Sequence, residues 1–461
     1  MGAARDEGVV DVTLLTAAQA LALLADGRLS AEELTRGCLA RITADEPRVQ
    51  AWAFLDEARA LQQARRADLH RKEGRALGAL HGLPVGVKDI VDTADMATED
   101  GTVLHAGRRP FHDATAVERL RAAGAVILGK TVTTELATGS PGKTRNPHDP
   151  QNTPGGSSSG SAAAVAAHMV PVAIGTQTNG GVIGPAAFCG VYGFKPTFGL
   201  VPRTGILTQS LPLDQVGFMA RSVEDIAIIA EPLVGYDEHD KATRPAAPLR
   251  LREIALQAPP LPPVFAYTKT PNWQDAAPEA REAFEEVAES LGEGVKPFNV
   301  PSVAADAWEW HRTLVEADIA RHFHDEYERG RDRLSEALRS QIERGRRVSA
   351  FDYNNAIDRM ATMEEAFEEV FDRCDAILTA AAPGPAPRGL ESTGNPAFCT
   401  LWTFAGMPAI SLPLLSAGNG MPMGVQLVGR KGDDARLLRT ARWLDGHIRS
   451  LGEPSGNGAN R

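Results

Sequence analysis

Residues 151–197 have a composition suited to holding a small polar molecule. No Asp, Glu, Lys or Arg occurs from position 150 to position 194, although these four residue types make up 23% of the chain. Glycines gather in a loop at 155–160 and again in a turn at 176–184. So many interruptions exclude a membrane span, because they would leave backbone groups unpaired in lipid. Glycine also lets several N–H groups converge on one point, so we expect buried loops that stabilise negative charge on a reacting carbonyl oxygen.

A lysine stands at the end of a predicted buried strand. The apolar run 83–87 is typical of a strand, and Lys88 follows it directly. Two environments are open to this side chain, a surface ion pair with Asp89 or burial. Burial disfavours the ammonium form and lowers the pKa of a lysine, so a buried Lys88 would be a base near neutral pH.

Helices and strands alternate through the first half of the chain. A capping box at Ser30 and Glu33 opens one of the helices. Apolar spacing predicts helices at 13–25, 30–43, 57–72, 114–123, 161–168 and 222–234, and strands at 83–87, 125–128 and 170–174. This alternation indicates an α/β fold in which a mixed central sheet lies between layers of helices.

The second half begins with a Pro- and Ala-rich segment at 244–263, which predicts a linker. Helical patterns follow at 278–291, 301–329 and 331–363. A buried strand is expected at 374–380, and a closing pair of strands at 408–414 and 423–428. The tail at 453–461 is expected to be disordered.

Composition limits the classes of function. The 461 residues include 48 basic and 59 acidic side chains, a net charge of −11, which opposes binding to nucleic acid or to an anionic membrane. Four cysteines show no CxxC or metal-ligand spacing, and the first residues, MGAARDEGVVDV, do not resemble a signal peptide. We therefore expect a cytoplasmic protein with free thiols.

Three motifs carry a resemblance to a known family. Residues 155–167 (GGSSSGSAAAVAA) and 175–199 (GTQTNGGVIGPAAFCGVYGFKPTFG) resemble the amidase signature of the Ser-Ser-Lys amidohydrolases. Residues 82–89 (GLPVGVKD) lie upstream, and 404–411 (FAGMPAIS) with 424–429 (GVQLVG) lie downstream. The resemblance covers essentially the whole chain. It implies one amidase-signature domain over 1–461, with a signature core at about 75–235, a helical cap on the substrate side at about 264–370 and the end of the core at 371–452.

The resemblance also implies roles for particular residues. Lys88 would be a buried neutral base, and Ser157, held by a cis peptide, would relay a proton to it. The backbone around Thr178, Asn179 and Gly180 would form the oxyanion hole, with Ser158 beside the substrate. The expected ligand is a small amide or another acyl compound. No metal or other cofactor is implied, and pairing into a homodimer is possible.

The nucleophile position departs from the family pattern. The pattern GTxTGGS ends in the serine that is acylated, and Gly181 stands there; Asn179 replaces a usual glycine. Three interpretations are open: an enzyme acting on an amide, ester or urea-type group without an acyl-serine, a catalytically silent pseudoamidase that binds a ligand or a protein, or an amidase inactivated by a Ser-to-Gly change. Ser157 could itself serve as a substitute nucleophile paired with Lys88.

Other candidate residues lie outside the signature. His311, His322 and His324 could form a metal site, but His322 and His324 are two positions apart on a helix and point in different directions. Trp308, Trp310 and His311 lie where such folds vary their substrate pocket, so we expect them to select ligand. Glu135 is expected to buttress the loops.

Overall fold

The computed structural model describes residues 11–452. Within them, an 11-stranded sheet has the order β1-β3-β2-β4-β6-β5-β10-β11-β9-β7-β8. The strands are β1 Trp52–Leu55, β2 Pro84–Lys88, β3 Val126–Thr131, β4 Val172–Gln177, β5 Tyr192–Lys195, β6 Gln215–Ala220, β7 Phe265–Tyr267, β8 Val295–Pro297, β9 Ala376–Ala380, β10 Ala409–Ser416 and β11 Pro422–Val428. β2 runs parallel to β3 and β4. In the centre of the sheet, the neighbouring strands β4, β6, β5, β10, β11 and β9 pair antiparallel in that order.

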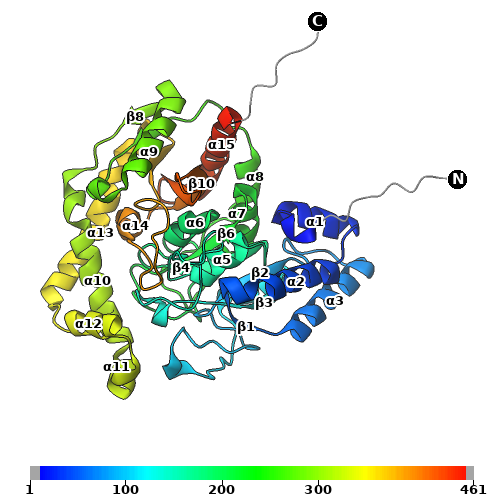
Figure 1. The fold of residues 1–461 in the computed structure, drawn as a ribbon. Helices are drawn as coiled ribbons and strands as arrows, with labels where there is room; N and C mark the ends of the chain where they lie inside the picture. Colours follow the sequence, from blue (N-terminus) through cyan, green and yellow to red (C-terminus); the bar gives the residue numbers. More distant parts are fainter. Residues whose placement is uncertain (1–10, 453–461) are drawn as a thin grey trace, which may run out of the picture.

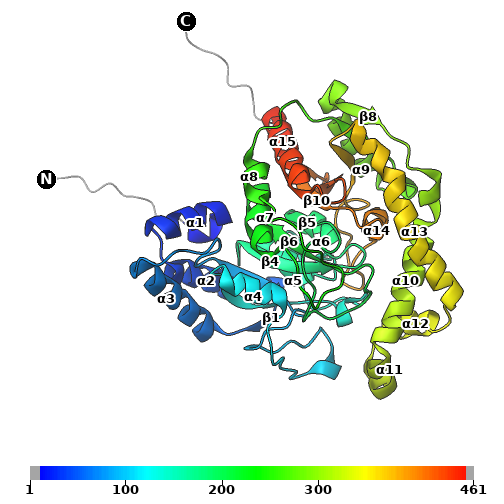
Figure 2. The same ribbon diagram turned by 180° about the vertical axis from the view of Figure 1, so that it is seen from behind.

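Helices cover this sheet, which confirms the predicted α/β fold with a mixed sheet (Figure 1). They are α1 Ala17–Asp26, α2 Ala31–Val49, α3 Glu57–Lys72, α4 Thr115–Ala122, α5 Ser159–Ala166, α6 Ile183–Cys189, α7 Val223–Ala230, α8 Leu251–Leu256, α9 Pro278–Leu291, α10 Ala307–His322, α11 His324–Gly330, α12 Glu336–Gly345, α13 Ala350–Glu368, α14 Ala397–Phe404 and α15 Asp434–Gly452. Figures 1 and 2 show α10–α13 at one side of the molecule and α1–α3 at the opposite side.

Two parts of the sequence prediction need correction. The expected linker at 244–263 contains α8, whose Leu251 and Ala255 are buried and which packs against α7 and α15. The single helix expected at 301–329 is a 3-10 turn, Ser302–Asp306, followed by α10 and α11, which break at Phe323. The tail at 453–461 lies outside the described residues.

The core contains two main clusters of buried side chains. One contains apolar residues of β2–β6 with those of α2, α5, α7 and α15. The other contains residues of α6, α10, α13 and α14, and it attaches the helices that follow β8 to the rest of the fold. The sheet draws strands from the beginning, middle and end of the chain. The single domain and the boundaries expected within it stay a prediction.

The register of β2 and β4 brings two polar side chains together. Val87 of β2 lies opposite Ile174 of β4, so both parallel strands end at the same edge of the sheet. Lys88 closes β2, and Thr176 stands near the end of β4. The glycine-rich loop before α5 lies at this same edge, where Ser158 bonds to β4.

Candidate active site

Lys88 is completely buried at the end of β2. Its Nζ donates hydrogen bonds to the Oγ of Ser157 at 2.6 Å and to the Oγ1 of Thr176 at 2.8 Å. Burial lowers the pKa of Lys88 to about 7, against an opposing effect of the nearby Asp214 carboxylate. The side chain can therefore exist as a neutral amine near neutral pH, and it is not the surface ion pair with Asp89 that the sequence left open.

The two signature serines differ in their surroundings. Ser157 follows a cis peptide bond from Gly156, and it lines a cavity while its Oγ contacts Lys88. Ser158 is fully buried, and its Oγ accepts a hydrogen bond from Thr176 N at 3.1 Å and donates to Thr176 O at 3.2 Å. Because both bonds hold β4, we assign Ser158 to fixing the strand end rather than to contacting substrate.

The turn at residues 178–181 is held by its carbonyl groups. Each of these four oxygens accepts a hydrogen bond. The donors are His311 Nε2 to Thr178 O (2.8 Å), Thr403 Oγ1 to Asn179 O (2.6 Å), Gly184 N to Gly180 O (2.9 Å) and Ser158 N to Gly181 O (3.3 Å). The carbonyls are thus turned toward the protein.

The N–H groups of the same turn are unpaired. Within residues 11–452, none of the N–H groups of 178–181 donates a hydrogen bond to another part of the chain, and all four residues line the same cavity as Ser157. Several free N–H groups beside one cavity are the arrangement that stabilises an oxyanion. The oxyanion role expected for the backbone of Thr178, Asn179, Gly180 and Gly181 stays a prediction.

Gly181 faces the serine that contacts Lys88. A Cβ on Gly181 would lie 3.2 Å from Ser157 Oγ and 2.5 Å from the carbonyl oxygen of Thr176. A side chain at this position would therefore be directed at Ser157. It would also press on the end of β4, because real Cβ contacts below 3.0 Å essentially do not occur.

Gln177 is a site residue that the sequence analysis missed. Its Oε1 accepts hydrogen bonds from Val182 N at 2.9 Å and Ile183 N at 3.0 Å, the residue before α6 and its first residue. Its Nε2 donates to Thr403 Oγ1 at 2.9 Å, and this hydroxyl in turn holds Asn179 O. Gln177 thus fixes the turn from both ends. Its place inside the GTQT motif was the available signal.

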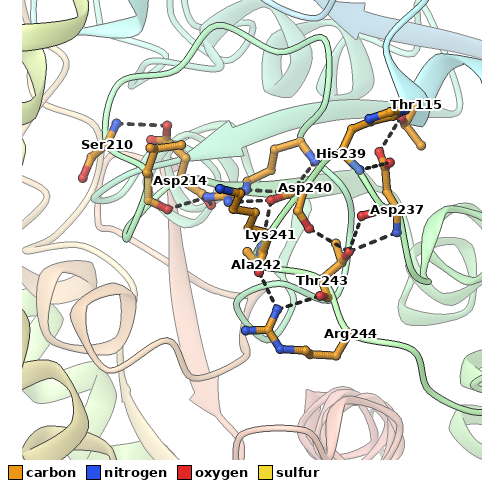
Figure 3. A network of polar contacts seen from close by, with 12 residues as sticks. Thr115, Ser210, Asp214, Asp237, His239, Asp240, Lys241, Ala242, Thr243 and Arg244 are labelled. Atoms are coloured by element: carbon orange, nitrogen blue, oxygen red, sulfur yellow. Dashed lines mark hydrogen bonds and ion pairs between the residues drawn. The ribbon is translucent and has the colours of Figure 1, made fainter.

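Asp214 is a second missed residue, and it lies behind the turn. Its Oδ1 accepts a hydrogen bond from Thr178 Oγ1 at 2.6 Å, and its Oδ2 accepts from the N–H groups of Gln209 and Ser210. Burial raises the pKa of Asp214 to about 6. Figure 3 shows the bond to Ser210 and the polar network around Asp240 beside it; Arg203 joins the two, bonding both Asp240 and Asp214 O.

The cavity beside Ser157 has a volume of about 350 Å³. Apolar side chains form much of its wall, including Phe188, Val315, Ile319 and Leu338, and Arg344 is the charged residue that lines it. Arg344 is paired with Glu316 at 2.7 Å. Polar side chains, including Thr138, Gln209 and Gln341, line it as well, so the cavity offers both polar and apolar contacts to a small molecule.

The helices after β8 contribute one of the expected ligand-selecting residues. His311 of α10 lines the cavity, and burial lowers its pKa to about 4, so it donates to Thr178 O as a neutral ring. Trp308 and Trp310 do not line it: Trp308 Nε1 donates to Ala397 O, and Trp310 packs on Phe404.

The structure also places Glu135, His322, His324 and Cys189. Glu135 accepts hydrogen bonds from Ser335 N at 3.1 and 3.3 Å, so it ties its loop to the start of α12 as expected of a buttress. His322 and His324 form no metal site: in residues 11–452, no group of three or more His, Cys, Asp or Glu side chains is placed to hold a metal ion. Cys189 is buried, and burial raises the pKa of its thiol.

Comparison with known proteins identifies the family. A family model described as Amidase matches residues 33–438. The chain belongs to the amidase family. This amidase-family hydrolase is 36% identical to the A subunit of glutamyl-tRNA(Gln) amidotransferase from Chloroflexus aggregans, over 96% of this chain and 99% of the relative.

Solved structures of the amidase family agree with this fold. A protein described in work on a vestigial complex and the origins of an s-triazine catabolic enzyme has a TM-score of 0.88 at 27% identity, covering 94% of this chain and 98% of its own. The 6-aminohexanoate cyclic dimer hydrolase in complex with substrate has a TM-score of 0.85 at 27% identity, covering 97% of this chain and 99% of its own. No helix of the described part of this amidase-family chain is long and apolar enough to cross a membrane.

Proposed function

We propose that the chain hydrolyses a small amide, ester or urea-type acyl group with a Lys88–Ser157 base pair, without an acyl-serine at position 181. The supporting observation is the 2.6 Å contact between Lys88 Nζ and Ser157 Oγ, because Ser157 lines the same cavity as residues 178–181, whose N–H groups have no partner among residues 11–452. Base and oxyanion donors around one carbonyl are what acyl transfer requires.

The proposed reaction begins with water as the nucleophile. Neutral Lys88 takes the proton of Ser157 while Ser157 takes a proton from the water, whose oxygen bonds to the substrate carbonyl carbon. The carbonyl π electrons move to the oxygen, and the N–H groups of the turn hold the resulting oxyanion. When the oxyanion collapses, the bond to the leaving nitrogen or oxygen breaks. Lys88 returns its proton through Ser157 to the leaving group, and an acid and an amine or alcohol remain.

Gly181 supports water attack over the usual covalent route. The family pattern places the attacking serine at this position, and glycine has no hydroxyl to acylate. Gly181 and Ser157 line the same cavity, so without a side chain at position 181 a water in this cavity can approach Ser157 Oγ. The relatives named as part of an amidotransferase and as a cyclic dimer hydrolase support chemistry at an acyl group.

A panel of activated amides and esters tests this function. Purified protein is expected to turn over at least one of them, and Lys88→Met, which keeps the volume of the buried side chain, is expected to abolish the reaction. Lys241→Ala changes an exposed lysine outside the cavity and serves as the control. Turnover that persists in Lys88→Met would overturn the proposal.

A silent pseudoamidase is the second candidate, and the absent hydroxyl at Gly181 favours it. Tight binding of amides without turnover, unchanged in Lys88→Met, would support that function. A Ser-to-Gly inactivated amidase is the third, and the additional departure at Asn179 argues against a single engineered change. For all three candidates we propose a cytoplasmic protein that binds small molecules rather than nucleic acid, consistent with its net charge of −11. A homodimer stays a prediction.

A further inference from the structure

The side chain of Asn179 is oriented by α14. Thr400 Oγ1 donates a hydrogen bond to Asn179 Oδ1 at 2.7 Å, in preference to the more distant Pro396 O at 3.3 Å, and Thr403 Oγ1 donates to Asn179 O at 2.6 Å. Two hydroxyls one helical turn apart therefore hold the two oxygens of one residue. With the carbonyl end of the carboxamide occupied, the Nδ2 end points away from α14.

The Nδ2 of Asn179 has no acceptor among residues 11–452. Although it has no partner, this nitrogen is not fully buried, and Asn179 lines the cavity. Gly180 and Gly181, whose N–H groups have no partner among the described residues, line the same cavity. A carboxamide NH₂ carries two hydrogens and accepts nothing, so a carbonyl oxygen or an oxyanion is the group it matches.

We propose that Asn179 is a catalytic residue whose Nδ2 donates a hydrogen bond to the substrate carbonyl oxygen and to the oxyanion formed from it. This inference rests on the proposed hydrolysis and adds a side-chain donor to the backbone N–H groups. A glycine, as in the family pattern, cannot supply it. An extra donor suits a site without a covalent intermediate, because a neutral water is a weak nucleophile and the oxyanion needs more stabilisation.

A purely structural role for Asn179 predicts different results. In that case Asn179 contributes only through its hydrogen bond with Thr400. The variant Thr400→Val removes this bond but leaves the carboxamide, so it should lower activity and melting temperature as much as Asn179→Ala does. A donor to the oxyanion acts mainly on kcat, since the interaction strengthens as the charge develops. Asn179→Ser keeps a short donor and should recover part of the loss.

Steady-state kinetics on the best substrate of the panel test the proposal. We expect Asn179→Ala to lower kcat about 10²-fold, in the range seen when one oxyanion donor is removed, with KM changed less than about threefold. Thr400→Val should lose less kcat than Asn179→Ala, and Asn179→Ser should lie between the parent and Asn179→Ala. Asn354→Asp, on the exposed face of α13, is a control expected to keep parental kinetics. Equal losses in Asn179→Ala and Thr400→Val, or kcat within twofold of the parent in Asn179→Ala, would overturn the assignment.

Binding separates this inference from the proposed hydrolysis. If the parent shows no Lys88-dependent turnover, the proposed hydrolysis fails, and benzamide, a neutral amide with one carbonyl, is titrated instead by calorimetry. At least tenfold weaker binding to Asn179→Ala than to the parent and to Thr400→Val supports the donor. Equal affinities, or no binding of benzamide by the parent, overturn it.

Discussion

The Nζ of Lys88 lies 2.8 Å from the Oγ1 of Thr176, and this contact ties the end of β2 to the end of β4. The same Nζ lies 2.6 Å from Ser157 Oγ. Thr176 is therefore the fixed partner of Lys88, and Ser157 is the partner that also faces the cavity. The position of the base depends on the register of two parallel strands.

Thr176→Val tests this dependence. The change removes one hydrogen bond to a buried amine at nearly constant volume, so we expect the free energy of unfolding to fall by about 1–3 kcal/mol and turnover to fall about tenfold. Urea denaturation and steady-state kinetics measure the two effects. Thr268→Val is the matched control, because Thr268 is also buried and its Oγ1 has no partner among the described residues. Parental turnover in Thr176→Val would contradict the assignment.

Activity should rise with pH as Lys88 loses its proton. Burial lowers the pKa of Lys88 to about 7, so kcat/KM is expected to increase through that pH. Asp214, with a pKa raised to about 6, would also produce an ascending limb. The profile of Asp214→Asn distinguishes the two groups: a limb due to Lys88 should remain but shift to lower pH, because the Asp214 carboxylate raises the pKa of Lys88, whereas a limb due to Asp214 should disappear. A profile that is flat from pH 6 to 8 would contradict a lysine base.

The stability of the fold should also rise with pH above 7. The unfolded chain protonates Lys88 with the ordinary pKa of 10.5, whereas the folded pKa is about 7. Between these values the unfolded state binds more protons, so the free energy of unfolding increases with pH. Lys195, also buried with a pKa near 7, adds to the same slope. The slope from Lys88 is therefore read as the difference between the parent and Lys88→Met, and it should be confined to the window from about pH 7 to 10.5.

Gly181→Ser reports on the space beside Ser157. The new Cβ would meet the Thr176 carbonyl oxygen at 2.5 Å, so we expect a loss of about 1–3 kcal/mol of stability from overpacking. The hydroxyl would be directed at Ser157, and an activated ester should leave an acyl group on residue 181, detected by mass spectrometry. Gly184→Ser, where a Cβ meets nothing within 4 Å, is the stability control. An acyl group found on Ser157 in the parent would instead indicate that Ser157 is the nucleophile.

His105 links the core to α11 through two carboxylates. Its Nδ1 lies 2.8 Å from Asp100 and its Nε2 lies 3.0 Å from Glu326. Hydrogen bonds to Asp100 first, and then to Glu326, raise the pKa of His105 to about 9 from 6.5. The stabilisation is therefore complete below pH 6.5 and is lost as pH rises to 9. In urea titrations, the cost of His105→Gln should shrink across this window, while His239→Gln, at an exposed position, should cost nothing at any pH.

The sequence located the site mainly where the chemistry is local. Lys88 could be placed because an apolar strand ends directly before it, and the turn at 178–181 because its glycines follow β4. Asp214 and Gln177 were missed because their functions depend on partners: Asp214 contacts Thr178 across 36 positions, and Gln177 reaches Thr403 across 226. The helix α8 was missed because six residues between prolines give little periodicity, and its packing on α15 determines its conformation.

The four carbonyl bonds that hold residues 178–181 come from different parts of the chain, and two of the donors stand on α10 and α14. His311 lies 133 positions from the residue it holds. The helices α10 and α14 therefore fix the backbone of residues 178–181, and α10 also lines the cavity beside it. A partner or ligand that displaced α10 would move the carbonyl group of Thr178 and with it the N–H groups of the turn. It would thereby change the rate of the proposed hydrolysis without contacting Lys88.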